Sequence, residues 1–275
     1  MEMNNNKLPI GVFDSGMGGL TVLRALKTTL AQESFIYLGD TARLPYGTKS
    51  PNTIQQYAIQ MARVLVERQI KALVIACNTA TTAALPHLQA MLPDIPVLGV
   101  VTPGASAVIA ATKNHRIAVL ATETTIASNA YQRLITAHLP QATISARACS
   151  LLVALAEEGM VGNAIARETL KHYLSELSGE DTLLLGCTHF PVFKPLLATL
   201  LPESVTIVDS AEATAKALKQ ALEQTNLLNT EQVQGNRISY LVTDSIKRFQ
   251  AVGEIFLGEP LQIHQIELVD AQSPS

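Results

Sequence analysis

The sequence reads ALVIACNT at residues 72–79 and TLLLGCTH at residues 182–189, two stretches in which a short apolar run ends at a cysteine and a polar turn follows. Apolar runs of this length are typical of strands buried in a parallel sheet, and ligands bind beyond the carboxyl ends of such strands. The repeated pattern places Cys77 and Cys187 at corresponding points in two halves of the chain. It predicts two acid/base thiols that face one site; the alternative is a pair of inert buried cysteines.

Apolar runs alternate with amphipathic segments along the whole chain, which is typical of βαβ units. We expect an α/β fold of two similar domains, each a mainly parallel sheet flanked by helices, which face each other across an active-site cleft. The clearest helix begins at Ser50-Pro51, a cap followed by proline at the first helical position, and continues to about Gln69; another runs from about Thr125 to His138. The expected strands are residues 10–14, 35–39, 72–76, 97–101, 117–121, 144–148, 182–186, 205–208 and 239–243.

The composition favours a compact soluble protein and excludes several classes of partner. Of 275 residues, 48% are hydrophobic and 16% charged, and the net charge of −3 is spread without a basic cluster. This argues against nucleic acid and anionic membranes as partners. The N-terminus has no apolar signal segment and no apolar run reaches the roughly 18 residues of a membrane span, so a cytoplasmic location is expected. Three cysteines without a CxxC pair argue against a disulfide framework or a structural zinc site.

A glycine-rich turn follows the first expected strand, in IGVFDSGMGGL at residues 10–20. It lacks both the dinucleotide fingerprint and the P-loop ending, and a carboxylate at the strand end would repel phosphate. The glycines instead favour close approach of the backbone to a small ligand. Asp14 would act on an ammonium group or a nearby thiol and Ser15 would donate hydrogen bonds, unless the segment is only a tight turn.

Other polar positions follow expected strand ends in the same way. Pro45 and Gly47 fix the backbone around Tyr46, so that N–H groups could point at a carboxylate, or else form a structural loop. Asn78 and Thr79 could bind a ligand or simply cap a helix. His189, two residues after Cys187, could lower the pKa of that thiol or carry its proton. The start of a helix beside each cysteine predicts a thiol pKa shifted down toward neutrality.

Racemisation of an amino acid without pyridoxal phosphate is the chemistry that uses both thiols. One thiol removes the α-proton while the other supplies a proton to the opposite face, and the reverse reaction exchanges the two roles. Hydroxyls of Ser15, Thr79 and Thr188 could hold the carboxylate beside the developing carbanion. A zinc site made by Cys77, Cys187 and His189 has no supporting close pair of ligands. A thiol protease or transferase would leave one cysteine unexplained.

Taken as a set, four motifs closely resemble the cofactor-independent glutamate racemases of bacteria, in the aspartate/glutamate racemase family. They are the turn at residues 14–19, PYG at 45–47, ACNTA at 76–80 and GCTHFP at 186–191. The resemblance implies an isomerase that makes D-glutamate from L-glutamate for peptidoglycan synthesis, with no cofactor and no metal. It also implies a discontinuous first domain, residues 1–99 plus 208–275, and a second domain of residues 100–207.

The resemblance also assigns roles to individual residues. It implies that Cys77 acts on the D-enantiomer and Cys187 on the L-enantiomer, that Asp14 and His189 assist them, one on each side, and that Glu157 assists the second thiol. The implied substrate-binding residues are Asp14, Ser15, Tyr46, Gly47, Asn78, Thr79, Thr188 and His189.

The sequence departs from the family pattern before that carboxylate. It reads Cys149-Ser150 where members usually read Cys-Pro, and Ala154 stands where a second proline is common. We therefore expect residues 151–159 to be more helical or more mobile, which leaves Glu157 and Glu158 as alternatives for the assisting carboxylate. Cys149 is expected to be structural.

Related proteins define the remaining alternatives. Aspartate racemases typically carry Glu two residues after the second cysteine, where this chain has His189, and related decarboxylases lack one of the thiols. A two-domain binding module without enzymatic activity would not need paired thiols. A homodimer is a further expectation, and a contact with DNA gyrase is reported for some family members.

Overall fold

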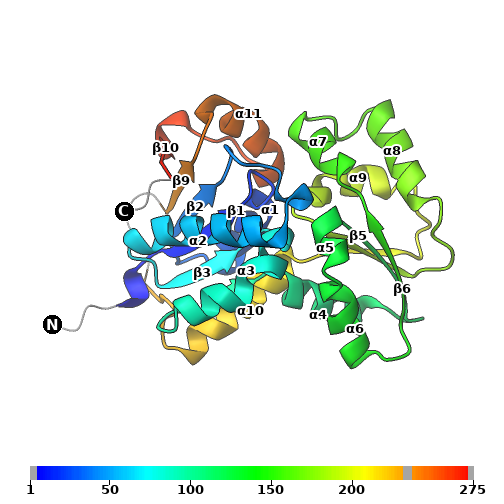
Figure 1. The fold of residues 1–275 in the computed structure, drawn as a ribbon, viewed down its shortest axis with the longest axis horizontal. Helices are drawn as coiled ribbons and strands as arrows, with labels where there is room; N and C mark the ends of the chain where they lie inside the picture. Colours follow the sequence, from blue (N-terminus) through cyan, green and yellow to red (C-terminus); the bar gives the residue numbers. More distant parts are fainter. Residues whose placement is uncertain (1–4, 232–236, 272–275) are drawn as a thin grey trace.

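The computed structural model describes residues 5–231 and 237–271, and within them the strands form two parallel sheets. The larger sheet has the order β10-β9-β2-β1-β3-β4 and the smaller sheet the order β6-β5-β7-β8. Figure 1 shows the sheets in two lobes side by side, here called the larger-sheet and smaller-sheet lobes. The predicted α/β fold is confirmed. The strands are β1 (Ile10–Asp14), β2 (Phe35–Gly39), β3 (Ala72–Ile75), β4 (Val97–Gly99), β5 (Arg116–Ala121), β6 (Thr143–Ala148), β7 (Thr182–Gly186), β8 (Thr206–Asp209), β9 (Ile238–Val242) and β10 (Ile266–Leu268).

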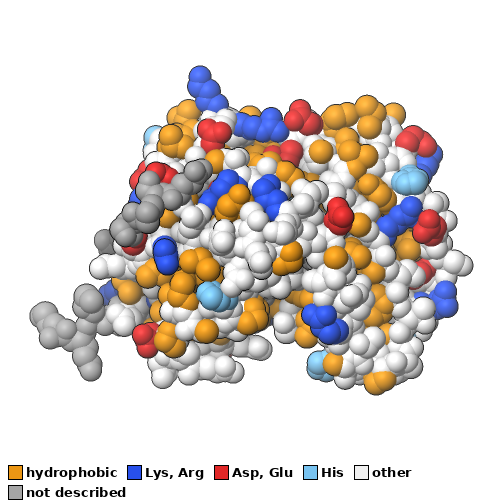
Figure 2. Space-filling view, viewed as in Figure 1, with side chains coloured by type: hydrophobic (Ala, Val, Ile, Leu, Met, Phe, Trp, Pro, Cys, Tyr) orange, Lys and Arg blue, Asp and Glu red, His pale blue; other side chains and the backbone are white. Residues whose placement is uncertain are grey.

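Helices cover the faces of both sheets, as the alternating pattern predicts. None of the described helices is long and apolar enough to cross a membrane. On the face drawn in Figure 2, basic and acidic side chains are interspersed over both lobes. The helices are α1 (Leu20–Thr29), α2 (Pro51–Glu67), α3 (Asn78–Met91), α4 (Val101–Ala111), α5 (Glu123–Ala127), α6 (Ala130–His138), α7 (Leu151–Glu157), α8 (Ala164–Leu174), α9 (Lys194–Leu197), α10 (Ala211–Gln224) and α11 (Ile246–Leu257), with 3-10 turns at Asn5–Lys7, Tyr46–Thr48, Phe190–Phe193 and Ile263–Gln265.

The α2 helix forms where its capping residues predict it. Ser50 is the cap, its side chain accepts a hydrogen bond from the Thr53 N–H, and Pro51 occupies the first helical turn. A proline costs nothing there, because the first N–H groups of a helix have no partner within it. The expected helix over 125–138 is instead two helices, α5 and α6. Asn129 lies between them with a φ of 53°, a left-handed conformation that asparagine adopts more readily than most residues.

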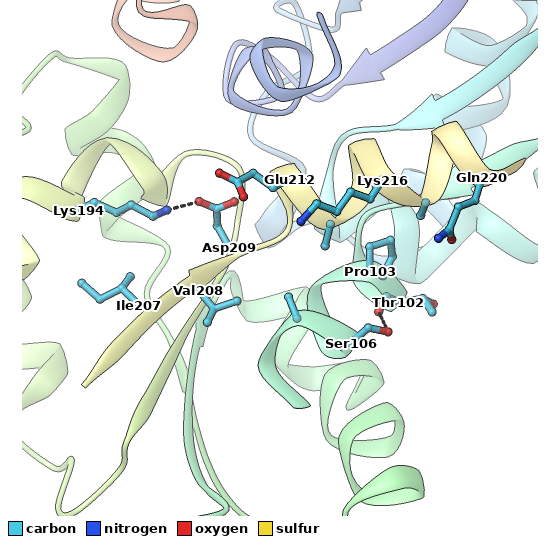
Figure 3. Close-up of a pocket in the computed structure, with 13 residues that line it drawn as sticks. Thr102, Pro103, Ser106, Lys194, Ile207, Val208, Asp209, Glu212, Lys216 and Gln220 are labelled. Carbon is cyan, nitrogen blue, oxygen red and sulfur yellow. Dashed lines mark hydrogen bonds and ion pairs between the residues drawn. The ribbon is translucent and has the colours of Figure 1, made fainter. Parts of the chain in front are cut away.

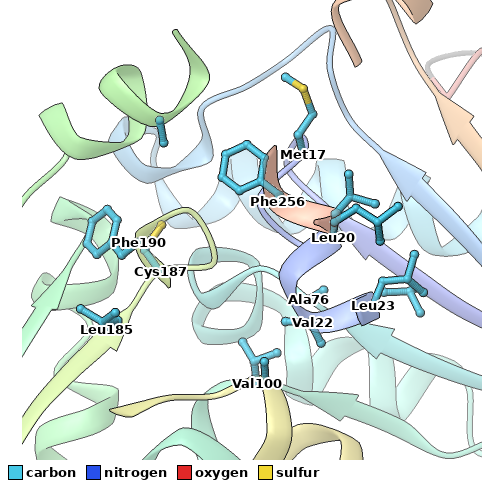
Figure 4. Packing of buried hydrophobic residues seen from close by; sticks show 14 of the residues in the cluster. Met17, Leu20, Val22, Leu23, Ala76, Val100, Leu185, Cys187, Phe190 and Phe256 are labelled. Atoms are coloured by element: carbon cyan, nitrogen blue, oxygen red, sulfur yellow. The ribbon is translucent and has the colours of Figure 1, made fainter. Parts of the chain in front are cut away.

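The central strands are buried on both faces, which explains their continuous apolar sequences. Every residue of β1, β3 and β7 is buried, whereas the edge strand β6 is half exposed. One apolar cluster also runs from lobe to lobe: Figure 4 shows Met17, Leu20 and Phe256 of the larger-sheet lobe near Cys187 and Phe190 of the smaller-sheet lobe. This shared core holds the carboxyl ends of the two sheets together.

Two details of the chain path lie beyond the sequence pattern. The strand β10, three residues long, pairs with β9 and was not expected. After β8 the chain returns to the larger sheet, where β9 pairs with β2. The helix between them, α10, packs on α1 and also on α4. The domain bounds 1–99 plus 208–275 and 100–207 stay a prediction.

Candidate active site

The candidate site is built from the carboxyl ends of β1, β3 and β7. Asp14 is the last residue of β1, and Cys77 and Cys187 follow β3 and β7. Both thiols line a single buried cavity between the lobes, and most of the sequence-predicted site residues line it with them. The residues around this cavity are Ser15, Pro45, Tyr46, Gly47, Cys77, Asn78, Thr79, Thr122, Val153, Cys187, Thr188 and His189.

Two predicted residues, Asp14 and Glu157, stand behind the lining and contact it. Thr188 Oγ1 donates to Asp14 Oδ1 at 3.4 Å, and His189 Nε2 lies 2.7 Å from Glu157 Oε1. Thr122 lines the cavity but was not predicted from the sequence. It directly follows β5, so the rule that ligands bind beyond strand ends would have found it.

Cys77 lies at the cap position of α3 and is 5% exposed. Its sulfur accepts the Ala80 N–H at 3.4 Å, and its thiol donates to Ser15 Oγ at 3.6 Å. Burial, reinforced by the negative charge of Asp14, raises the pKa of Cys77 to about 12, although the Ala80 and Ser15 contacts act in the opposite direction. The expected shift toward neutrality is therefore wrong for this residue. Removal from water outweighs the helix N-terminus, and Cys77 is a protonated thiol at neutral pH.

Cys187 has an imidazole ring beside it. His189 Nδ1 lies 3.9 Å from the Cys187 sulfur, and on the other side of the ring Nε2 contacts Glu157. Burial lowers the pKa of His189, but its hydrogen bonds to Cys187 and Glu157 and their negative charges outweigh burial and raise that pKa well above the ordinary value. The ring can therefore hold a proton between the thiol and the carboxylate near neutral pH.

The carboxylate that reaches His189 is Glu157. Its side chain is 5% exposed, whereas that of Glu158 is 62% exposed and pairs with Arg248 at 3.0 Å. Residues 151–157 form the helix α7, as expected for a segment without the two prolines of the family pattern. The helix directs Glu157 inward and leaves Glu158 at the surface. Cys149 is buried and lies outside the residues that line the cavity.

Asp14 is fully buried and its two oxygens are engaged. Oδ2 accepts the N–H groups of Gly16 and Gly19 at 3.1 and 3.0 Å, while Oδ1 accepts the Thr188 hydroxyl. Burial raises the pKa of Asp14, against the opposing effects of the His189 charge and the two N–H groups. Asp14 thus joins the lobes through Thr188. It influences Cys77 through its charge, whereas His189 contacts Cys187 directly.

The glycines of the first turn are required by close contacts. A Cβ on Gly18 would lie 2.4 Å from His189 Nδ1, and one on Gly19 would lie 2.6 Å from Asp14 Cβ. Both distances are shorter than side chains tolerate. The turn therefore brings the backbone of the larger-sheet lobe against His189, whereas the predicted close approach to a small ligand stays a prediction.

The loop that carries Tyr46 and Gly47 is fixed at both ends. Asp40, at the end of β2, accepts hydrogen bonds from the Tyr46 hydroxyl and from Arg43 Nε, the latter at 2.7 Å. A Cβ on Gly47 would lie 2.6 Å from Thr122 Cβ, and the Gly47 carbonyl accepts from Thr124 at 3.0 Å. The loop consequently docks on the smaller-sheet lobe and closes one wall of the cavity. Asp40 was missed from the sequence although it also follows a strand.

Polar groups suited to a carboxylate line the remaining wall. Asn78 is 2% exposed, and its Nδ2 has no hydrogen-bond partner among the described residues. Thr79 Oγ1 lies 2.8 Å from Thr122 Oγ1 across the junction of the lobes. A buried amide nitrogen without an acceptor is costly, so it marks a position where an anionic ligand group would be stabilised.

The cavity between the thiols is small, about 20 Å³. A single water needs about 10–15 Å³ of such space. A second cavity of about 240 Å³ shares Pro45, Gly47, Thr122 and Val153 with it and extends outward to Arg248. A third, of about 630 Å³, lies between α4, β8 and α10, beside the Lys194–Asp209 ion pair (Figure 3), and contains none of the predicted site residues. No cluster of three or more His, Cys, Asp or Glu in the described chain is placed to hold a metal ion.

Comparison with known proteins places this site in a family. The family model for Asp/Glu/hydantoin racemases matches residues 10–218, and the chain belongs to that family. It is 48% identical over 262 residues to a glutamate racemase of Geobacter metallireducens, covering 94% of this chain and 96% of the relative. A glutamate racemase of Neisseria meningitidis serogroup C is 45% identical over 271 residues, with 98% and 99% covered.

Solved structures agree with these relatives. The glutamate racemase of Francisella tularensis in complex with D-glutamate superposes with a TM-score of 0.88 at 38% identity, covering 97% of this chain and 99% of that one. The Escherichia coli enzyme in complex with L-glutamate and the activator UDP-MurNAc-Ala gives a TM-score of 0.78 at 30% identity, with 95% and 98% covered. An aspartate racemase of Picrophilus torridus, 20% identical, shares the fold alone. The predicted resemblance to the glutamate racemases is confirmed, and the protein is an isomerase.

Proposed function

We propose that this protein interconverts L- and D-glutamate without a cofactor, with Cys77 and Cys187 as the two acid/base groups. One observation carries the proposal: the thiols follow equivalent strands of two sheets, yet they line the same buried cavity. Relatives named glutamate racemases at 45–48% identity support glutamate as the substrate.

In the L to D direction, the Cys187 thiolate takes the α-proton, and the Cys77 thiol gives its proton to the opposite face of the α-carbon. After this step Cys187 is a thiol and Cys77 a thiolate, which is the state that D-glutamate needs for the reverse reaction. The raised pKa of Cys77 makes it a protonated donor at neutral pH. A protonated His189 beside Cys187 stabilises negative charge on that sulfur.

The carbanion between the two steps needs electrostatic stabilisation in a site without bulk water. Asn78 Nδ2 is the donor whose position is best suited to a substrate carboxylate, because it is buried and has no acceptor among the described residues. The hydroxyls of Ser15, Thr79 and Thr188 lie around the same cavity. Together they provide donors on both lobes.

Substrate entry requires the lobes to separate. A cavity of about 20 Å³ is too small for glutamate, which has four carbons besides its α-carboxylate. The outer cavity beside Pro45 and Val153 supplies the route, and closure afterwards would exclude water from the carbanion. The hydrogen bonds of Thr79 to Thr122 and of Thr188 to Asp14 are among the inter-lobe contacts that opening must break.

The cellular role that fits the family is supply of D-glutamate for peptidoglycan. Depletion of the protein in its host should arrest wall growth, and added D-glutamate should restore growth; failure of D-glutamate to rescue would contradict this role. A homodimer and a contact with DNA gyrase stay predictions.

The activity is tested with purified protein in deuterated buffer without pyridoxal phosphate. L-glutamate and, separately, L-aspartate are followed by circular dichroism and then by mass analysis for α-deuterium. We expect the optical signal of glutamate alone to decay as deuterium enters. Exchange of aspartate alone would assign an aspartate racemase, while no exchange of either by a folded, reduced protein would favour the decarboxylase or binding-module alternative.

A further inference from the structure

A tyrosine of the smaller-sheet lobe contacts the side-chain amide of Asn78, the amide whose nitrogen has no partner among the described residues. Tyr131, on α6, is 1% exposed, and its hydroxyl donates to Asn78 Oδ1 at 2.5 Å. Asn78 begins α3 in the other lobe, so this hydrogen bond crosses between the lobes. Tyr131 does not line the cavity and has no role in the two-thiol scheme.

The ring of Tyr131 is positioned by two glycines. A Cβ on Gly186 would lie 3.0 Å from Tyr131 Cε2, and one on Gly104 would lie 3.0 Å from its hydroxyl oxygen. Gly186 directly precedes Cys187, so the ring packs behind the strand end that carries the second thiol. Burial raises the pKa of the Tyr131 phenol, which therefore keeps its proton and remains a donor at all ordinary pH values.

An asparagine amide has one accepting end and one donating end, and both need partners when buried. When Nδ2 of Asn78 faces a carboxylate in the cavity, Oδ1 faces away and needs a donor. The Tyr131 hydroxyl is that donor. Without it, the orientation that binds a carboxylate would leave a buried carbonyl oxygen unpaired, and the rotated amide would turn its oxygen toward the anionic substrate.

We propose that Tyr131 is a positioning residue, whose hydroxyl holds the Asn78 amide with Nδ2 directed at a substrate carboxylate and does so only when the lobes are closed. This inference rests on the proposed function, because it assumes an amino-acid substrate in the cavity. It makes the carboxylate donor of one lobe dependent on a residue of the other. An open enzyme consequently lacks an oriented amide, and closure creates it.

The test is a double-mutant cycle of Y131F and N78A, with Y240F as the matched control. Phenylalanine keeps the ring that packs on Gly186, and Tyr240 is a buried tyrosine of β9 outside the site. We expect Y131F to raise KM for both enantiomers about tenfold, with a smaller fall in kcat, while Y240F leaves both unchanged. Added to N78A, Y131F should change KM less than twofold.

Two results would overturn the proposal: an unchanged KM in Y131F, or a further tenfold rise when Y131F is added to N78A, which would mean that Tyr131 acts independently of Asn78. Calorimetric binding of L-glutamate to the four proteins of the cycle (the parent, Y131F, N78A and the double variant) gives a second readout that does not need turnover. If the parent protein binds glutamate without racemising it, the proposed function fails, but the binding cycle still decides the role of Tyr131.

Discussion

The two thiols stand at equivalent strand ends but in different surroundings. Among the described residues, the sulfur of Cys77 has hydrogen bonds to the Ser15 hydroxyl and the Ala80 N–H, and the charge of Asp14 reaches it without a hydrogen bond. Cys187 lies beside His189, which in turn contacts Glu157. The chain path is thus nearly symmetric around the cavity, whereas the groups that can relay a proton are concentrated on one side.

This asymmetry has a thermodynamic limit. Enantiomers have equal free energies in water, so the equilibrium constant is unity and kcat/KM must be equal in both directions for every variant. Unequal support of the two thiols can therefore appear only in kcat and KM taken separately.

The largest effect is expected from removing either thiol. C77S and C187S should each lower kcat/KM for racemisation by about 10³-fold or more, because a serine hydroxyl is a far weaker acid than a thiol. Each variant should retain one half-reaction, which a glutamate with chloride at C3 reveals. Deprotonation expels chloride, and the enamine that forms hydrolyses to 2-oxoglutarate and ammonium.

We expect C187S to eliminate chloride only from the D-configured compound and C77S only from the L-configured one. The control is C149S, which removes the third buried thiol and should keep near-normal activity. Near-normal racemisation by C77S or C187S would refute the two-thiol scheme, and the opposite pattern of elimination would exchange the assignments of the two thiols.

The next largest effect concerns the relay beside Cys187. H189N removes the ring that contacts the sulfur and should lower kcat for L-glutamate by about 10²-fold. The kcat for D-glutamate should fall less, because Cys77 starts that direction. Initial rates from both enantiomers, monitored by circular dichroism, measure the two values. Equal losses of kcat in both directions would show that His189 serves both thiols alike.

Much of this site follows from the sequence because its residues lie at strand ends. Short continuous apolar runs form buried strands, so the nine expected strands are found within about two residues of their predicted bounds. Cys77, Asn78, Cys187 and His189 follow these strands. The break at Asn129 and the three-residue β10 escaped because each depends on a single backbone conformation or a single pairing.

What the local sequence pattern could not provide is the set of contacts between segments far apart in the chain. The partnership of Tyr131 with Asn78 joins residues 53 positions apart, and that of His189 with Glu157 joins residues 32 apart. No local pattern encodes such pairs. The same reason explains the wrong direction for the pKa of Cys77. The helix start is visible in the sequence, but the degree of burial of the thiol in the folded chain is not.

The pH profile offers a smaller but directional test of the Cys77 surroundings. Activity needs one thiol and one thiolate, so it is lost at high pH when the second thiol ionises. Because the pKa of Cys77 is raised to about 12, the alkaline limb of kcat/KM should lie well above the ordinary thiol range of about 8.5.

The D14N variant tests the cause of that shift. Removing the negative charge of Asp14 stabilises the Cys77 thiolate and should move the alkaline limb to lower pH, whereas H189N should not move it in that direction. A parent limb near the ordinary thiol value, or a limb that D14N moves upward, would contradict this account of Cys77.

The smallest effect distinguishes the two adjacent carboxylates of α7. E157Q keeps the shape of the side chain that contacts His189 but removes its charge, so kcat for L-glutamate should fall about tenfold.

E158Q breaks only the exposed pair with Arg248, which bridges the lobes at the rim of the outer cavity. An exposed pair of this kind contributes at most about 1 kcal/mol and is screened by salt. E158Q should therefore change kcat less than twofold and change KM modestly at low salt only, because Arg248 still lies 3.9 Å from Glu157 Oε2 when Glu158 loses its charge. A larger effect of E158Q than of E157Q would contradict the role given to Glu157. The asymmetry between the two thiols would then have to arise from lobe closure rather than from the buried Glu157–His189 contact.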